Sequence, residues 1–315
     1  MDPVTETWFA RRTWQEPAWT ADELVAAKAG RRVSVVLPAL DEEATVGPIV
    51  AAILPFTLGP DPLVDELVVV DSGSTDRTIE VATAAGARVV RRTDVVPDLE
   101  PCPGKGEVLW RALAATTGDV ICYIDSDLVD FEPGFVPALI GPLLVEEGVH
   151  LVKGFYRRPL RLETSEVTGK FDNGGGGRVT ELLVRPLIAA LRPELAGVVQ
   201  PLGGEYAGTR ELLESLPFAA GYGVEIGLML DTYATRGLDA IAQVNLGVRK
   251  HRNRSLLQLG VMARQILAAA LSRCGVADAG GALTQFVQVG GEWLPDSTPV
   301  VVAERPPMRE VVRRE

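Results

Sequence analysis

The first 130 residues alternate short, β-branched apolar runs with segments of helical character, and this alternation restricts the fold more than any other feature. The runs at 33–37 and 67–70 have no regular polar face. Such runs are typical of parallel strands that helices cover on both sides, whereas half-exposed strands alternate polar and apolar residues. Strands that alternate with helices build βαβ units. The sequence therefore predicts an α/β fold with a mostly parallel central sheet flanked by helices.

The composition disfavours several classes of protein. The 315 residues carry a net charge of -11, so the chain as a whole repels polyanions and any phosphate ligand must meet a local basic cluster. Cys102, Cys122 and Cys274 form no CxxC pair, which argues against a disulfide framework and a zinc site. The N-terminus lacks the apolar core of a secretory signal, and prolines interrupt the longest uncharged run, 44–60. We therefore expect a cytoplasmic protein without membrane insertion and without a nucleic-acid partner.

Polar residues gather where three predicted strands end, at 38–43, 71–76 and 125–127. In open parallel sheets, ligands bind beyond the carboxyl ends of the strands, so these residues should face one crevice. Asp125 and Asp127 form a D-x-D motif that suits a hard divalent cation, which prefers oxygen ligands and could grip a diphosphate. Taken alone, the motif is equally consistent with a turn cap and a solvated acid.

A second candidate phosphate contact is Lys105, which stands between Gly104 and Gly106 just before a predicted helix. Backbone N–H groups and one ammonium could meet a phosphate there. The P-loop spacing GxxxxGK(S/T) is absent, and no GxGxxG follows the first strand. The sequence therefore disfavours a nucleoside triphosphatase and a dinucleotide-dependent dehydrogenase.

The second half of the chain carries three further candidates. The stretch GGGGRVT, which begins a predicted helix at 178–191, offers a guanidinium, a hydroxyl and helix N-terminal amides as a phosphate cradle, although a mobile linker explains it equally well. Glu225 is a lone acid in an apolar helix-like stretch, where burial needs a partner or a functional reason. His251 lies in RKHRNR, a basic cluster that could neutralise a departing diphosphate or simply form a surface loop.

The segments VVLPALDEEATV, VVVDSGSTDRT, PGKGEVLWRAL and IDSDLV together resemble the GT-A nucleotide-sugar glycosyltransferases. The later segments LVKGFYRRPL, GGGRVTELLVRPL, QPLGGEY, GYGVEIGLMLD and NLGVRKHRNR are similar to the glucosyl-3-phosphoglycerate synthase family, retaining enzymes of glycosyltransferase family 81. This resemblance spans residues 14–285 and implies a GT-A fold with a Rossmann-like sheet and an acceptor-binding C-terminal part. It implies transfer of glucose from UDP-glucose to the 2-hydroxyl of 3-phosphoglycerate, in methylglucose lipopolysaccharide or glucosylglycerate synthesis.

The same resemblance implies roles for individual residues. The donor site would consist of Pro38, Ala39, Leu40, Glu42 and Ser72 around the uridine and of Lys105, Asp125, Ser126, Asp127, Arg249 and Arg254 around the diphosphate. The acceptor site would consist of Gly177, Arg178, Val179, Thr180, Tyr222 and Asn253. Both lists join segments that lie far apart in the sequence.

The metal and the chemistry follow from the resemblance as well. Asp127 and His251 would hold Mg2+, with Mn2+ or Co2+ able to substitute, and diphosphate oxygens and water would complete the shell. Glu225 and the Leu202 carbonyl would contact the sugar and, with Asp127 and Lys105, form the catalytic set. No residue stands out as a covalent nucleophile, so a donor phosphate oxygen could accept the hydroxyl proton.

The chain is expected to divide into an N-terminal extension at 1–30, a nucleotide-sugar-binding part at 31–160, an acceptor-binding and metal-completing part at 161–285, and a C-terminal arm or tail at 286–315. Within the third part, 238–248 is predicted to be extended and 256–271 helical. The resemblance implies a homodimer, for which the C-terminal helix and arm are candidate contacts.

Two departures from the family pattern leave alternatives open. Asp41 stands where the family usually has asparagine, and four glycines precede Arg178 where fewer are expected. A carboxylate beside the nucleotide pocket could change the base preference, so GDP-mannose, used by the related mannosyl-3-phosphoglycerate synthases, is an alternative donor. A non-catalytic nucleotide-sugar-binding protein is the alternative from another class, although the intact motifs argue against it.

Overall fold

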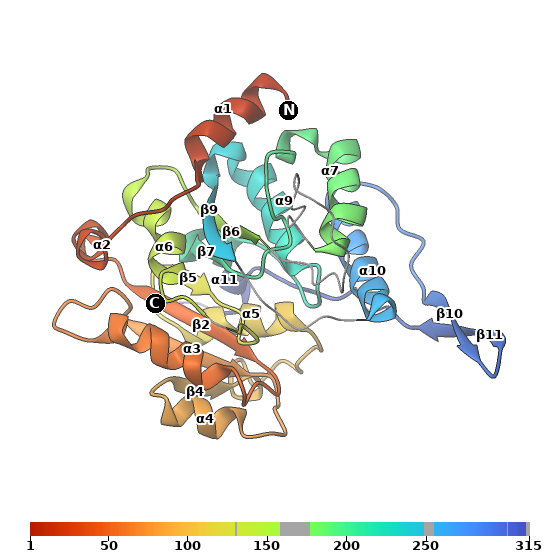
Figure 1. Cartoon of the computed structure of the whole chain (residues 1–315), viewed down its shortest axis with the longest axis horizontal. Helices are drawn as coiled ribbons and strands as arrows, with labels where there is room; N and C mark the ends of the chain where they lie inside the picture. Colours follow the sequence, from red (N-terminus) through yellow and green to blue (C-terminus); the bar gives the residue numbers. More distant parts are fainter. Residues whose placement is uncertain (130, 158–176, 249–254, 301, 313–315) are drawn as a thin grey trace, which may run out of the picture.

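A computed structural model gives the structure of the chain and describes residues 1–129, 131–157, 177–248, 255–300 and 302–312 (Figure 1). Within these residues an eight-stranded sheet has the order β1-β9-β6-β7-β5-β2-β3-β4. Its strands are β1 (Thr13–Trp14), β2 (Val33–Ala39), β3 (Glu66–Asp71), β4 (Arg88–Arg91), β5 (Val120–Tyr123), β6 (Leu151–Arg157), β7 (Tyr206–Thr209) and β9 (Ile241–Val248). The pairs that β7 forms with β5 and β6 are antiparallel, and the other pairs are parallel. The predicted mostly parallel sheet is thus confirmed.

Helices cover both faces of this sheet, and strand β2 shows how. Val35 and Leu37 belong to one buried cluster and Val36 to another, and all three side chains are fully buried. The first cluster includes side chains of α2 (Ala21–Lys28), α3 (Val46–Ile53), α4 (Thr78–Ala84) and α6 (Phe135–Val145). The second includes side chains of α5 (Lys105–Ala115), α8 (Arg210–Ser215) and α9 (Val224–Arg236). Burial on both faces explains why the strand sequences show no polar alternation.

The later elements agree with the expected ones. The helix predicted at 178–191 is present, with the π-helical turn η3 (Thr180–Val184) leading into α7 (Arg185–Leu191). The helix predicted at 256–271 is α10 (Leu256–Arg273). The segment predicted to be extended at 238–248 is a strand only from 241, as β9, because Leu238–Ala240 form the 3-10 turn η5. Helices α7, α9 and α10 share a third buried cluster with Trp8 of α1 (Pro3–Arg12). None of the described helices combines the length and apolar character that a membrane crossing requires.

The two ends of the chain contribute strands of their own. Strand β1 pairs with β9 in the main sheet, and the Trp8 indole N–H donates to the Ile241 carbonyl at 2.8 Å. Near the other end, β10 (Leu283–Val289) and β11 (Glu292–Thr298) form a hairpin that projects from the body (Figure 1). Strand β12 (Glu304–Arg305) then returns to pair with β8 (Phe218–Ala219). One sheet holds strands from three of the expected parts of the chain, 1–30, 31–160 and 161–285. We therefore propose that these parts differ in function but do not fold as separate domains.

The start of α5 needs glycine because another segment touches its backbone. A Cβ on Gly106 would lie 1.8 Å from the Ala219 carbonyl oxygen. Gly104 has a φ of 124°, and a Cβ there would lie 2.4 Å from the Ala220 carbonyl oxygen. This contact lets the Glu107 N–H donate to the Ala220 oxygen at 3.0 Å. The glycines flanking Lys105 therefore allow α5 to begin directly against the segment that follows β8.

Gly106→Ala should reduce the free energy of unfolding by about 1–3 kcal/mol, because backbone must move to admit the added methyl group. Gly134→Ala is the matched control, since Gly134 has a helical φ of -58° and no atom within 4 Å of an added Cβ. Its effect should stay below about 1 kcal/mol in either direction. Urea denaturation followed by circular dichroism measures both values, and equal stability of the two variants would contradict the close packing.

Candidate active site

The carboxyl ends of β5, β2 and β3 lie side by side and join three of the sequence motifs. Strand β2 pairs with β3 up to Ala39 and Asp71, and with β5 up to Val36 and Tyr123. The Ser126 hydroxyl donates to the Pro38 carbonyl at 2.6 Å. These contacts place the predicted uridine-binding residues beside the D-x-D motif, as expected at the carboxyl edge of an open sheet.

Hydrogen bonds also tie together the loops that follow β2 and β3. Asp71 is buried and accepts hydrogen bonds from the N–H groups of Gly73 and Ser74 at 2.9 and 3.2 Å. Asp41 has a φ of 55°, and its Oδ1 accepts from the Thr75 N–H at 2.8 Å and the Thr75 hydroxyl at 3.2 Å. The carboxylate that departs from the family pattern therefore holds the neighbouring loop.

The remaining predicted uridine contacts occupy the same two loops. Leu40 is 53% exposed, and the Glu42 N–H donates to the Thr78 hydroxyl at 2.7 Å. Ser72 donates its backbone N–H to the Ala39 carbonyl at 2.8 Å. The structure thus brings together all five residues expected around the uridine: Pro38, Ala39, Leu40, Glu42 and Ser72.

Lys105 bridges two acidic residues from different elements. Its Nζ lies 2.5 Å from Asp125 Oδ1 and 2.9 Å from Glu225 Oε1. Burial by itself lowers the pKa of Lys105, but the charges of Asp125 and Glu225 outweigh it and raise this pKa above its ordinary value. The ammonium therefore stays protonated, and it joins the acid predicted beside the diphosphate to the acid predicted beside the sugar.

Lys153 is a residue of the site that the sequence analysis missed. Its side chain is buried in β6, and its Nζ donates to the Gly203 carbonyl at 2.7 Å and lies 4.7 Å from the ring centroid of Tyr206. Burial lowers the pKa of Lys153 to about 8, although the nearby Glu225 carboxylate opposes this shift. The sequence signal that could have identified it is a lone lysine in the apolar run LVKGFY, where a buried charge needs a polar partner or a functional role.

The turn that carries Leu202 is packed against these charges. A Cβ on Gly204 would lie 2.3 Å from Asp125 Oδ2 and 2.7 Å from Lys105 Nζ. A Cβ on Gly203 would lie 2.6 Å from the Gly154 carbonyl oxygen. Only glycine fits at both positions, so the turn is held between β6 and the Lys105 bridge.

The predicted acceptor residues fall in two described segments. Gly177 accepts the Glu181 N–H at 3.1 Å, and Arg178 is exposed while Val179 and Thr180 are buried, so the predicted cradle begins a helix. The Tyr222 N–H donates to Gln265 of α10 at 3.1 Å. Val179, Leu202 and Tyr222 share one hydrophobic cluster, which places the two segments near the Leu202 turn. Arg249, His251, Asn253 and Arg254 lie outside the described residues.

The predicted metal site would need ligands in addition to those that the described residues provide. The described residues include no cluster of three or more histidine, cysteine or acidic side chains that could hold a metal. Asp127 follows β5 and is partly exposed at the carboxyl edge of the sheet, where a single carboxylate could bind a hard cation that takes its other ligands from diphosphate and water. The residues present fit a Mg2+ or Mn2+ ion that binds together with a nucleotide, with His251 as the expected second ligand.

Comparisons with known proteins agree with this geometry. Residues 34–161 match the family model described as glycosyl transferase family 2. The glucosyl-3-phosphoglycerate synthase of Mycolicibacterium smegmatis is 62% identical over 96% of this chain and 97% of its own length. That of Mycobacterium tuberculosis is 59% identical over 94% of this chain and 91% of its own.

Solved structures of the Mycobacterium tuberculosis enzyme are similar throughout. Its complex with Mn2+, UDP and phosphoglyceric acid has a TM-score of 0.86 and 57% identity over 95% of this chain and 98% of that one. Its complex with Mn2+, UDP-glucose and phosphoglyceric acid has a TM-score of 0.85 at the same identity and coverage. Its complex with Mg2+ and UDP has a TM-score of 0.85 and 56% identity over 96% of this chain and 99% of that one. The resemblance inferred from the motifs is confirmed, and this chain is a glycosyltransferase that belongs to the glucosyl-3-phosphoglycerate synthase family.

Proposed function

We propose that this enzyme transfers glucose from UDP-glucose to the 2-hydroxyl of 3-phosphoglycerate, giving glucosyl-3-phosphoglycerate and UDP with retained anomeric configuration. The observation that carries the proposal is the Lys105 bridge, with 2.5 Å to Asp125 and 2.9 Å to Glu225. It brings a cation and two acids from separate motifs to the edge of the sheet where nucleotide sugars bind in this fold. The complexes of the related enzyme with UDP-glucose and phosphoglyceric acid support the choice of substrates.

The donor contacts follow from the strand ends. The uridine would lie on the linked loops after β2 and β3, and the Lys105 ammonium would meet the diphosphate. Asp127 and His251 would hold Mg2+, for which Mn2+ or Co2+ could substitute, and Ser126, Arg249 and Arg254 would line the diphosphate. A bound divalent cation would stabilise the negative charge of the departing diphosphate. Because Asp41 Oδ1 is occupied by Thr75, Asp41 supports the loops rather than selecting a different base.

The reaction breaks the bond between the anomeric carbon and the UDP oxygen and forms a bond to the acceptor 2-hydroxyl oxygen on the same face. The hydroxyl proton passes to a phosphate oxygen of UDP, so no side-chain base is needed. Glu225 would bind glucose hydroxyls, and the Leu202 carbonyl would lie near the anomeric carbon. Lys105 and Lys153 provide positive charge at fixed positions beside the leaving group and the Leu202 turn.

The acceptor would bind across two segments that meet near the Leu202 turn. Gly177, Arg178, Val179 and Thr180 would hold the phosphate of 3-phosphoglycerate through the guanidinium, the hydroxyl and the amides at a helix start. Tyr222 and Asn253 would complete the site. This arrangement positions the 2-hydroxyl, and such positioning can supply much of the rate enhancement of a two-substrate reaction.

We also propose that the enzyme is a cytoplasmic homodimer whose contact includes the β10–β11 hairpin. Phe286, Trp293 and Leu294 on this hairpin are 59%, 66% and 44% exposed. A projecting hairpin with such side chains is a candidate for burial against a second copy.

The direct test of function is nucleoside-diphosphate release by the purified enzyme with Mg2+ and 3-phosphoglycerate. UDP-glucose should support release only when acceptor is present, and chelation of Mg2+ should stop it. GDP-mannose in place of UDP-glucose tests the alternative donor. Faster release of nucleoside diphosphate from GDP-mannose than from UDP-glucose would contradict the proposed donor. Release that does not depend on the acceptor would contradict the proposed reaction.

Lys105→Met should lower kcat by about 100-fold or more, because it removes the fixed charge beside the leaving group and leaves two facing carboxylates unshielded. Lys28→Met is the matched control, since Lys28 forms a similar partly buried ion pair with Asp65 at 2.7 Å on α2. The control should change stability but keep a kcat close to that of the wild type. Steady-state kinetics on both variants measures kcat. Equal losses of kcat would contradict a specific role for Lys105, because loss of any such ion pair would then lower the activity.

Light scattering should give the mass of two chains for the wild type, because the exposed hairpin residues are expected to be covered. Trp293→Ser with Phe286→Ser should shift the mass toward one chain, whereas Val4→Ser, at a residue that is 72% exposed on α1, should not. A wild-type protein with the mass of one chain at micromolar concentration would reject the homodimer.

A further inference from the structure

The end of the described chain forms a strap, which we define as residues 303–308, across the start of α5. Strand β12 pairs antiparallel with β8, matching Glu304 with Ala219 and Arg305 with Phe218. The Ala220 N–H donates to the Ala303 carbonyl at 2.8 Å. Met308 is buried in the cluster that includes α5 and α8. The strap is therefore packed into the body of the protein rather than lying loosely on its surface.

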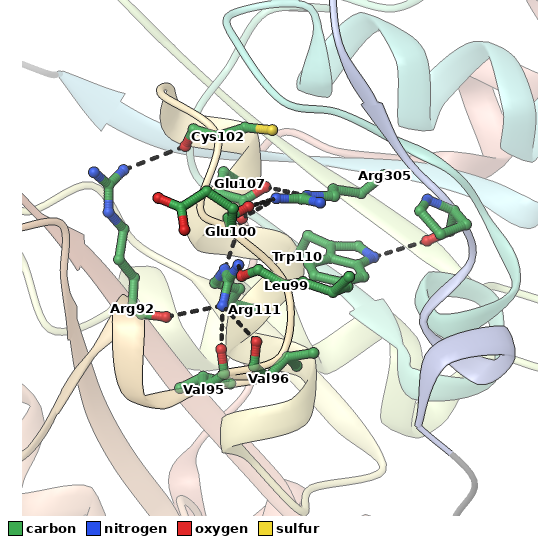
Figure 2. Close-up of polar contacts among 11 residues, drawn as sticks. Arg92, Val95, Val96, Leu99, Glu100, Cys102, Glu107, Trp110, Arg111 and Arg305 are labelled. Carbon is green, nitrogen blue, oxygen red and sulfur yellow. Dashed lines mark hydrogen bonds and ion pairs between the residues drawn. The ribbon is translucent and has the colours of Figure 1, made fainter.

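Arg305 connects the strap to α5 (Figure 2). Its Nε lies 2.6 Å from Glu107 Oε2 and its Nη2 lies 2.9 Å from Glu107 Oε1, so the guanidinium engages both carboxylate oxygens. Its Nη2 also donates to the Glu100 carbonyl at 2.5 Å, and the group lies 5.3 Å from the ring centroid of Trp110. The Trp110 indole N–H donates to the Pro306 carbonyl at 2.8 Å. The paired geometry fixes the orientation of the helix as well as its distance from the strap.

Glu107 is completely buried and is also held by a second arginine, Arg111 of the same helix. Arg111 Nε donates to Glu107 Oε1 at 2.6 Å, and Arg111 itself is fully buried. The Arg111 guanidinium also donates to a ring of backbone carbonyls from Arg92, Val95, Val96 and Leu99 (Figure 2). A buried carboxylate held by two guanidinium groups is sensitive to the loss of Arg305, because Glu107 Oε2 would lose the donor that Arg305 Nε provides away from water.

This cluster lies next to the donor site in the sequence and in space. Glu107 is two residues beyond Lys105, and its N–H donates to the Ala220 oxygen at 3.0 Å. Ala220 is five residues before Glu225. Neither α5 nor α9 begins with a side-chain cap, since their N-caps are Gly104 and Gly223. The strap contacts the start of α5 through Arg305, and it pairs with β8 and Ala220, which precede α9 in the chain. The starts of α5 and α9 are the two that bring Lys105 within 2.9 Å of Glu225.

We propose that Arg305 is a positioning residue for the donor site, holding the start of α5 so that Lys105 stands between Asp125 and Glu225. The proposal rests on the proposed function for the identity of the donor. Arg305 acts through Glu107, while the backbone of the strap holds Ala220 through the Ala303 carbonyl. Its loss should therefore weaken the donor diphosphate and sugar contacts more than the acceptor contacts.

The test compares Arg305→Met and Arg305→Lys with the control Arg309→Met, which changes an exposed arginine four residues later in the chain. Arg305→Met should raise the UDP dissociation constant measured by calorimetry with Mg2+ by about tenfold, and lower kcat/KM for UDP-glucose by at least about tenfold. The KM for 3-phosphoglycerate should stay within about twofold of the wild type. Arg305→Lys should recover part of the loss because it keeps the charge without the paired geometry. Arg309→Met should match the wild type.

Several outcomes would overturn the positioning role. A UDP affinity equal to that of the wild type in folded Arg305→Met would contradict it, as would equal losses for donor and acceptor. Thermal unfolding and circular dichroism identify the folded fraction, and if Arg305→Met does not fold, Arg305→Lys must show the donor-selective loss for the proposal to stand. UDP binding needs no acceptor, so a wild type that binds UDP but does not act on 3-phosphoglycerate would refute the proposed function while leaving this test intact.

Discussion

The ammonium of Lys105, placed between the carboxylates of Asp125 and Glu225, is the interaction on which the arrangement of the site depends. The two acids come from the end of β5 and the start of α9, and the cation comes from the start of α5. Two carboxylates that are close together and largely buried repel each other strongly unless a cation stands between them. The bridge therefore stabilises the approach of three elements that are distant in the sequence and sets the arrangement of charges at the site.

Helix α5 can provide this cation only because its first turn is held from several sides. Gly104 and Gly106 admit the backbone of Ala219 and Ala220, and Glu107 lies between Arg111 and Arg305. A fixed charge stabilises a transition state more than a mobile one because it needs no reorganisation during the reaction. The chemistry proposed for Lys105 therefore depends on the packing that holds the first turn of α5.

Much of the fold could be predicted from short-range patterns. The parallel sheet, the helix at 178–191 and the helix at 256–271 are confirmed, because periodicity and strand-end polarity are local properties of the sequence. Lys153 was missed, since nothing local reveals that the Gly203 carbonyl would meet its ammonium. The hairpin begins at Leu283, ahead of the arm predicted at 286–315, and the arm also holds a strand that pairs with β8, which joins segments far apart in the chain. The basic cluster around His251 lies outside the described residues and stays a prediction.

The sequence by itself determined the family and the chemical types of the candidate site, because the motifs at the strand ends follow one another in a fixed order along the chain. It also determined the buried faces of the strands through their continuous apolar runs. Only the tertiary structure decided which charges pair. The partners of Lys105, Lys153 and Glu107 are set by long-range packing, and the free energy of a buried charge depends on neighbours that sequence order does not reveal.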